Sequence, residues 1–162
     1  MFLGYHLISN SYNSYHSIER APDYKETYTY DTGQTFEFME YEITIVDDIG
    51  WVFLEHHDEE NRLNGAVVIR IPIKITNLSE ETRGFSTYPM TIYGPYASRL
   101  EDISSYFMGR SDVRYLNNMQ SGETVSDRYI HILYIGDGDY SIVFDTWTEA
   151  NREVIVHILK ED

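Results

Sequence analysis

The clearest pattern in the chain is an alternation of aliphatic and mixed residues from Ala66 to Thr76. Because successive side chains of a strand point to opposite faces, this pattern predicts a half-buried strand. Its other face carries Arg70, Pro72 and Lys74, and Pro72 predicts a sheet edge or a bulge because proline has no N–H for a ladder. The aliphatic face consists of Val67, Ile69, Ile71, Ile73 and Ile75.

Further short runs of β-branched and aromatic residues, separated by Gly, Asn, Asp and Ser, predict an all-β domain. With hardly any helical periodicity, they favour a two-sheet antiparallel sandwich. Gly136 to Asp139 predicts a hairpin between two apolar runs, and the spacing of Leu100, Ile103 and Phe107 allows a helical turn over Ser98 to Tyr106. The other expected strands are Thr35 to Phe38, Tyr41 to Val46, Trp51 to Leu54, Met90 to Tyr93, Thr124 to Ile135, Tyr140 to Trp147 and Glu153 to Leu159.

The first part of the chain differs from the rest. Ser9 to Ser17 is a polar, tyrosine-containing tract with neither a helical nor a strand period, and its low apolar content cannot offset the entropy of ordering. We therefore expect residues 1–33 to form an irregular N-terminal arm or tether, and residues 34–162 to form the sandwich. In the alternative, the tyrosines of the arm dock on the domain.

Composition narrows the possible functions. The 162 residues contain 12 Lys+Arg and 27 Asp+Glu, a formal net charge of −15, which disfavours nucleic-acid binding and adsorption to an anionic membrane. The absence of cysteine excludes disulfides, thiol nucleophiles and thiolate zinc sites. The acids lie largely between apolar runs, which favours solvation of a sandwich. The sequence contains no recognisable signal peptide and no apolar run of about 18 residues, the length of a membrane-spanning helix.

Three segments resemble a known family. They are a strand that ends in Asn77 and a small polar loop, a Gly122-Glu123-Thr124 segment that opens a strand, and the closing strand Tyr140 to Phe144. From about residue 34 onward the chain is similar to an immunoglobulin-like domain of unknown function that is grouped with the mycobacterial immunoprotective extracellular antigens and is common in Gram-positive lipoproteins. Ser121 stands where that family commonly has proline.

The resemblance implies an immunoglobulin-like sandwich, export, and anchoring through a signal or lipobox that this sequence does not include. It implies no catalytic residues. For two residues we expect structural roles: Asn77 bonds the local backbone where its strand ends, and Gly122 occupies a turn with positive φ.

The best candidate metal ligands are His56, His57 and Asp58, in the acidic run that continues to Glu60. Adjacent histidines on an extended chain point to opposite faces, so a solvated acidic loop is the favoured interpretation and we predict no metal or cofactor. His131 and His157 lie within apolar strands, where a place on the solvated sheet face is favoured over a catalytic role. Because no nucleophile and base pair can be named, we expect a protein without enzymatic activity.

Tyrosine supplies rigid amphipathic area of the kind that enriches binding surfaces, and the chain has 15 of them. Near the long irregular stretch from Gly94 to Gly122, we predict a contact surface that includes Tyr88, Tyr93, Tyr96 and Tyr106.

The main hypothesis is a non-enzymatic, extracytoplasmic domain of the cell envelope that binds a protein or an envelope component. The alternative is an intracellular acidic inhibitor, immunity-type protein or DNA mimic that blocks a basic partner. A mimic needs its acids on one contiguous surface, whereas a solvated envelope domain scatters them.

Overall fold

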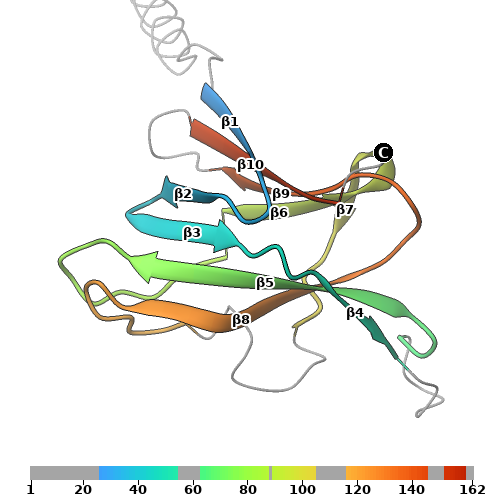
Figure 1. Cartoon of the computed structure of the whole chain (residues 1–162), viewed down its shortest axis with the longest axis horizontal. Coiled ribbons are helices and arrows are strands. Elements are labelled where there is room, and N and C mark those ends of the chain that lie inside the picture. The colour runs from blue at the N-terminus through green and yellow to red at the C-terminus, as the bar shows by residue number, and fades with distance from the viewer. Residues whose placement is uncertain (1–25, 55–62, 88, 105–115, 146–151, 160–162) are drawn as a thin grey trace, which may run out of the picture.

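The computed structural model describes residues 26–54, 63–87, 89–104, 116–145 and 152–159. These residues form β1 (Glu26–Asp31), β2 (Thr35–Phe38), β3 (Tyr41–Ile45), β4 (Gly50–Phe53), β5 (Val67–Asn77), β6 (Met90–Gly94), a 3-10 turn η1 (Pro95–Ala97), β7 (Ser98–Leu100), β8 (Thr124–Leu133), β9 (Tyr140–Asp145) and β10 (Arg152–Leu159) (Figure 1). Within this part of the chain, no helix is long and apolar enough to cross a membrane.

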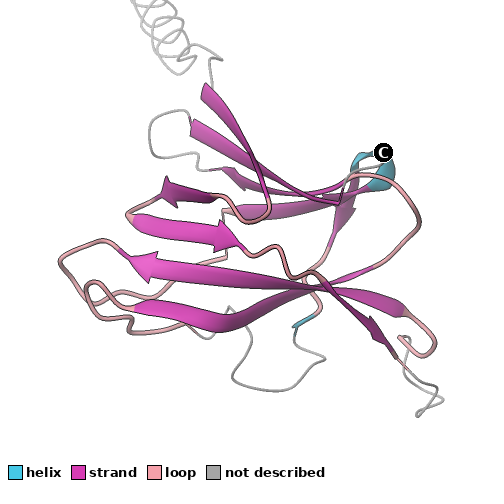
Figure 2. Ribbon diagram, in the orientation of Figure 1, coloured by secondary structure: helices cyan, strands magenta, loops and turns pink. Residues whose placement is uncertain are grey.

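The strands form two sheets. The first has the order β1-β10-β9-β6-β7, and the second has the order β2-β3-β5-β4, with β8 on the other side of β5. Figure 2 shows the two sheets as facing layers. All strand pairs are antiparallel except β1 with β10, which is parallel. The predicted all-β, immunoglobulin-like sandwich is thus confirmed.

The core lies between the sheets and confirms the alternation seen in the sequence. Ile69, Ile71, Ile73 and Ile75 of β5 are fully buried, whereas Arg70 and Lys74 of the other parity are exposed. From the opposite sheet, Phe144 meets the rings of Phe36 and Phe38 at centroid distances of 5.2 and 5.7 Å. Interdigitated aliphatic and aromatic side chains from both sheets therefore hold the sandwich together without disulfides.

The N-terminal boundary differs from the prediction. Residues 26–31 of the expected arm form β1, which pairs in parallel with residues 152–157 of β10. Most β1 side chains are exposed, so the strand lacks the apolar face that marks the other strands in the sequence. Residues 1–25 lie outside the described residues.

Pro72 does not lie on an edge strand, because β5 is paired on both sides. On one side β3 pairs with residues 73–77 and β4 with residues 67–70, so Pro72 faces the break between them. Its carbonyl accepts a hydrogen bond from the Val46 N–H there, at 2.9 Å. The N and O of one strand residue point to the same side, so the missing N–H faces a gap where no ladder partner needs it.

Two further local predictions differ from the structure, the first entirely and the second in part. Gly136 to Asp139 is not a hairpin turn, because β8 and β9 belong to different sheets and this segment carries the chain from one to the other. The range Ser98 to Tyr106, where a helical turn was expected, begins as a strand, since Ser98–Leu100 is β7 and pairs with the neighbouring β6. Ser104 in the same range has 3-10 conformation, and residues 105 and 106 lie outside the described residues.

Asn77 and Gly122 have the expected structural roles. The buried Asn77 amide donates to the carbonyls of Glu81, Met119 and Gln120 at 2.8, 3.1 and 3.2 Å. Its side-chain oxygen accepts hydrogen bonds from the backbone N–H and the hydroxyl of Ser79. Gly122, with φ +73°, donates its N–H to the Asn77 carbonyl. The end of β5 is therefore tied to both neighbouring loops.

Candidate functional site

Large hydrophobic side chains are exposed at one end of the sandwich, where Figure 1 places the tip of β4, the β8–β9 connection and η1. Trp51 and Phe53 of β4 are 53% and 63% exposed, Ile135 of the connection is 49% exposed, and Tyr96 of η1 is 100% exposed. We call these four residues the open-end surface.

The exposure of Trp51 and Phe53 follows from where the opposite sheet ends. Trp51 shares a cross-strand row with Ile69 and Ile132, and both isoleucines are fully buried. In the next row, Phe53 is exposed beside Val67, which is only half-buried. At β4, the core-facing side of this sheet therefore extends beyond the part that the opposite sheet covers.

A series of aromatic rings connects this surface to the core. Trp51 contacts Tyr134 edge-on at a centroid distance of 5.2 Å, and Tyr134 stacks on the buried Tyr140 at 6.2 Å. The Tyr140 hydroxyl donates to the Gly136 carbonyl at 2.8 Å and accepts from the Ile135 N–H at 3.0 Å. Trp51 is therefore backed by a positioned neighbour, which lowers the entropy that it loses on binding.

The surroundings of Tyr134 and Tyr140 raise the pKa values of both side chains. The carboxylate of Asp137 accepts a hydrogen bond from the Tyr134 hydroxyl and raises the pKa of Tyr134 to about 12. Burial raises the pKa of Tyr140. Both phenols therefore keep their protons to a higher pH than an ordinary tyrosine.

Tyr96 is held out by an unusual turn. Tyr96 and Ala97 both have positive φ, 58° and 55°, in the turn closed by the bond from the Ser98 N–H to the Pro95 carbonyl. Such a turn normally takes Asn and Gly, and an L-residue in this region costs about 1–2 kcal/mol. Tyr96 adopts this costly backbone conformation although its side chain is fully exposed and gains no free energy from burial.

Close packing fixes η1 against the β8–β9 connection. A Cβ atom on Gly138 would lie 2.9 Å from Pro95 Cβ, so a larger residue at position 138 would push the two segments apart. At Gly94, a Cβ atom would lie 2.9 Å from Leu100 Cδ1 and 3.4 Å from Ile135 Cδ1. These glycines therefore permit the approach that places Ile135 and Tyr96 at the same end.

The predicted contact residues fall in different places. Tyr96 belongs to the open-end surface, and Tyr93 is half-buried in β6, where it pairs with Arg99 and Ser141. Tyr88 and Tyr106 lie outside the described residues. Trp51 and Phe53 were not predicted. The only signal for them in the sequence is two aromatic residues of one parity just before an acidic run, which alone indicates a buried strand face equally well.

The metal candidates His56, His57 and Asp58 also lie outside the described residues. Among the residues that are described, no group of three or more His, Cys, Asp or Glu side chains is arranged to hold a metal ion.

A buried polar cluster forms where the chain crosses from β7 to the edge of β8. The prediction that His131 lies on a solvated face of the sheet was wrong. His131 is buried beneath this crossing segment. Ser104 is 2% exposed, and its Oγ lies 3.0 Å from His131 Nδ1. The Ser104 hydroxyl donates to Asp102, whose Oδ1 also accepts from the Ser104 N–H at 2.9 Å.

This cluster has the residue types of a hydrolase triad but not its connectivity. In a triad, the imidazole takes the serine proton and the carboxylate orients the imidazole. Here the Ser104 hydroxyl donates a hydrogen bond to the carboxylate of Asp102, and the Ser104 side chain is buried. The cluster instead closes the edge of β8: the Ile103 N–H donates to the His131 carbonyl at 2.7 Å, and Ser104 Oγ accepts from the His131 N–H at 3.1 Å.

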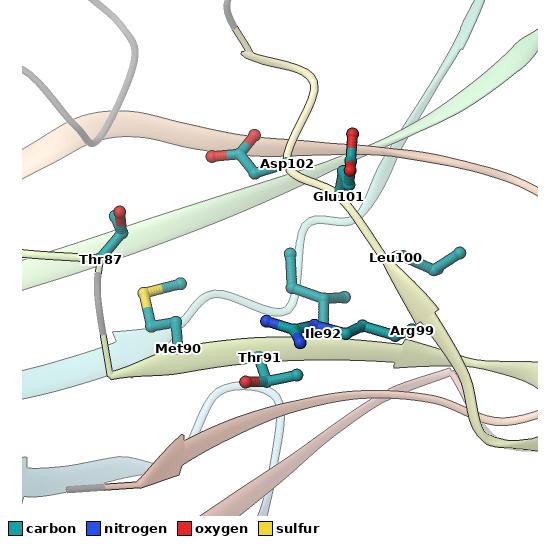
Figure 3. Close-up of a pocket in the computed structure, with 8 residues that line it drawn as sticks. All are labelled: Thr87, Met90, Thr91, Ile92, Arg99, Leu100, Glu101 and Asp102. Carbon is teal, nitrogen blue, oxygen red and sulfur yellow. The ribbon is translucent and has the colours of Figure 1, made fainter.

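A pocket of about 440 Å³ lies beside the same crossing segment (Figure 3). Met90 and Ile92 supply apolar side chains from β6, and the Asp102 carboxylate is already engaged by Ser104. The other charged side chains of the lining, Arg99 and Glu101, are exposed. Because the described residues of the lining leave no buried polar group to orient a ligand, this pocket is a weaker candidate than the open-end surface. The described residues that line it are Thr87, Met90, Thr91, Ile92, Arg99, Leu100, Glu101 and Asp102.

Comparison with solved structures supports the fold. The chain is similar to the yjhA protein of Bacillus subtilis, with 13% identity and a TM-score of 0.56 over 80% of this chain and 99% of that one. It is also similar to a functionally unknown protein from Listeria monocytogenes, with 13% identity and a TM-score of 0.56 over 81% of this chain and 84% of that one.

A third similar structure is ycdA of Bacillus subtilis, described as a candidate lipoprotein, with 10% identity and a TM-score of 0.55 over 79% of this chain and 39% of that one. No family model matches the chain, and no curated protein matches it. At these identities the likeness shows a shared sandwich fold among bacterial proteins of unknown function.

Proposed function

We propose that this protein is a non-enzymatic, extracytoplasmic domain of the cell envelope that binds another protein or an envelope component through its open-end surface. The observation that carries the proposal is the exposure of Trp51, Phe53, Tyr96 and Ile135 at one end of the sandwich. Aromatic residues on a rigid support are the usual energetic centres of protein interfaces.

The envelope location is supported by the similar structures. The candidate lipoprotein ycdA shares the fold, as does one from Staphylococcus aureus, with 15% identity and a TM-score of 0.51 over 80% of this chain and 89% of that one. In this proposal the chain is a member of the immunoglobulin-like family grouped with the mycobacterial extracellular antigens, and a signal or anchor lies beyond these 162 residues.

The absence of enzymatic activity is supported by the cluster of Asp102, Ser104 and His131. Its serine is buried and its proton is directed to the carboxylate, so the cluster closes a sheet edge and offers no nucleophile to a substrate.

The distribution of acidic residues favours this proposal over an acidic inhibitor or a DNA mimic. Glu26 and Glu153 lie on one sheet, Glu37 and Glu42 lie on the other, and Asp137 lies in a connection between the sheets. Acids on both sheets keep a sandwich soluble, whereas a mimic needs a single array.

Site-specific photo-crosslinking tests the proposal. A photoreactive phenylalanine analogue is placed at position 51 or 96 of the full-length gene product in its native cells, with position 78 as the control. Leu78 is 44% exposed and precedes a different loop. We expect a discrete adduct from positions 51 and 96 in the envelope fraction and none from position 78. Identical adduct patterns from all three positions, or adducts confined to the cytosol, would overturn the proposal.

A further inference from the structure

The strand β4 offers an unpaired edge within the described residues. It pairs with β5 on one side only. The Leu54 N–H donates to the Ala66 carbonyl and the Leu54 carbonyl accepts from the Gly65 N–H, so the main-chain groups of Leu54 face the β5 side. Because these groups alternate along a strand, those of Val52 face β5 as well, and those of Trp51 and Phe53 point to the open edge.

Two other edges of the sandwich are protected by devices that β4 lacks among the described residues. At β8, the crossing segment bonds both main-chain groups of His131. At β2, Glu37 places an exposed charge in the middle of the strand. Proteins usually block an edge by such devices, or by Lys, Pro or a bulge. The sequence of β4, Gly-Trp-Val-Phe, contains none of them and presents two exposed aromatic residues.

Acidic residues precede this edge. Asp47 and Asp48, just before β4, are exposed. The chain as a whole carries a formal net charge of −15. A second copy of this chain would therefore be repelled, whereas a basic segment would be attracted to Asp47 and Asp48.

We propose that β4 receives an extended, basic segment of a partner protein, which adds to the sheet as a further strand. The main-chain groups of Trp51 and Phe53 supply the ladder bonds, and their side chains cover alternate apolar residues of the incoming segment. Lysine or arginine residues of the segment pair with Asp47 and Asp48. This inference rests on the proposed function and adds the mode of binding and the chemistry of the partner.

The test uses the full chain with Trp147→Phe, so that Trp51 is its single tryptophan. The probes are three blocked octapeptides: alternating Lys and Val, the same sequence with every amide N-methylated, and alternating Glu and Val. We expect the Lys-Val peptide to shift the Trp51 emission to the blue and to bind at least tenfold more tightly than the other two.

Two variants locate the site. Phe53→Lys places a positive charge on the edge and should weaken Lys-Val binding at least tenfold. Leu78→Lys, at a position that is 44% exposed, should leave binding unchanged. Thermal melting of both variants checks that each is folded.

Each of the following outcomes would refute one part of the proposal. Equal binding of the Lys-Val and N-methylated peptides rules out strand addition, and equal binding of Lys-Val and Glu-Val rules out a basic partner. An emission shift that depends on protein concentration without peptide shows a second copy at the edge. Failure of all three peptides, together with specific crosslinks from position 51, refutes this inference and leaves the proposed function intact. Loss of those crosslinks refutes the proposed function itself.

Discussion

Replacement of Asn77 by alanine tests how the end of β5 is held. The side-chain amide of Asn77 has two hydrogens, which it shares among three backbone carbonyls at 2.8 to 3.2 Å. Each carbonyl keeps a second donor after the change: the N–H of Arg83, the N–H of Glu123 or the hydroxyl of Ser79. Losing two such hydrogen bonds therefore costs their net value, about 1 kcal/mol each.

The larger cost comes from the acceptor side. The buried backbone N–H of Ser79 donates to the Asn77 side-chain oxygen at 3.0 Å and loses that acceptor, which costs about 1–3 kcal/mol. The sum is a fall of about 3 to 5 kcal/mol in the free energy of unfolding, a large share of the roughly 5–15 kcal/mol that holds a domain together.

Urea denaturation followed by far-ultraviolet circular dichroism measures this fall. Leu78→Ala serves as the matched control, because Leu78 is the next residue and its side chain is partly exposed, so its loss should cost less than about 0.5 kcal/mol. If Asn77→Ala cost no more than this control, the side-chain hydrogen bonds of Asn77 could not be what fixes the two loops.

The remaining predictions concern the turn, the titration and the core. Tyr96→Gly removes positive-φ strain from a side chain without packing, so the free energy of unfolding should rise by about 0.5 to 1 kcal/mol in urea denaturation, and a fall would show that the ring is packed. The pKa of Tyr134 is raised from 10.0 to about 12 mainly by its hydrogen bond to Asp137, so the stability it contributes is complete below about pH 10 and is lost as the pH rises to about 12. Asp137→Asn should lower that pKa, which carbon-13 NMR of labelled tyrosine measures, and an unchanged pKa would contradict the assignment. Phe144→Ala, in the core, should cost about 3–5 kcal/mol, whereas Phe53→Ala at the exposed edge should cost less than about 0.5 kcal/mol, and equal costs in urea denaturation would refute the assignment of core and surface.

Local patterns predicted the strands that bury one face. The isoleucines of β5 and the apolar residues of β9 and β10 alternate because a sheet packed on one side selects for that period. The turn at Gly122 and the hydrogen bonds of Asn77 with Ser79 and Glu81 were predictable for a related reason, since each depends on backbone geometry within a few residues. The sequence by itself therefore determined the all-β class and most strand positions.

Pairing between distant segments decided what those patterns could not. The Thr and Tyr residues of β1 favour a strand, but the strand exists through its parallel partner β10, more than a hundred residues away in sequence. The break between β3 and β4 likewise accommodates Pro72 inside a sheet. Neither feature leaves a local apolar pattern.

The candidate site depends most on tertiary structure. Tyr96 was predictable as a tyrosine beside a turn, but its exposure depends on the close contact of Pro95 with Gly138. Trp51 and Phe53 share the parity of a core-facing strand, and only the extent of the opposite sheet leaves them exposed. Sequence determines which face of a strand is apolar, whereas the packing of the two sheets determines how much of that face is left for a partner.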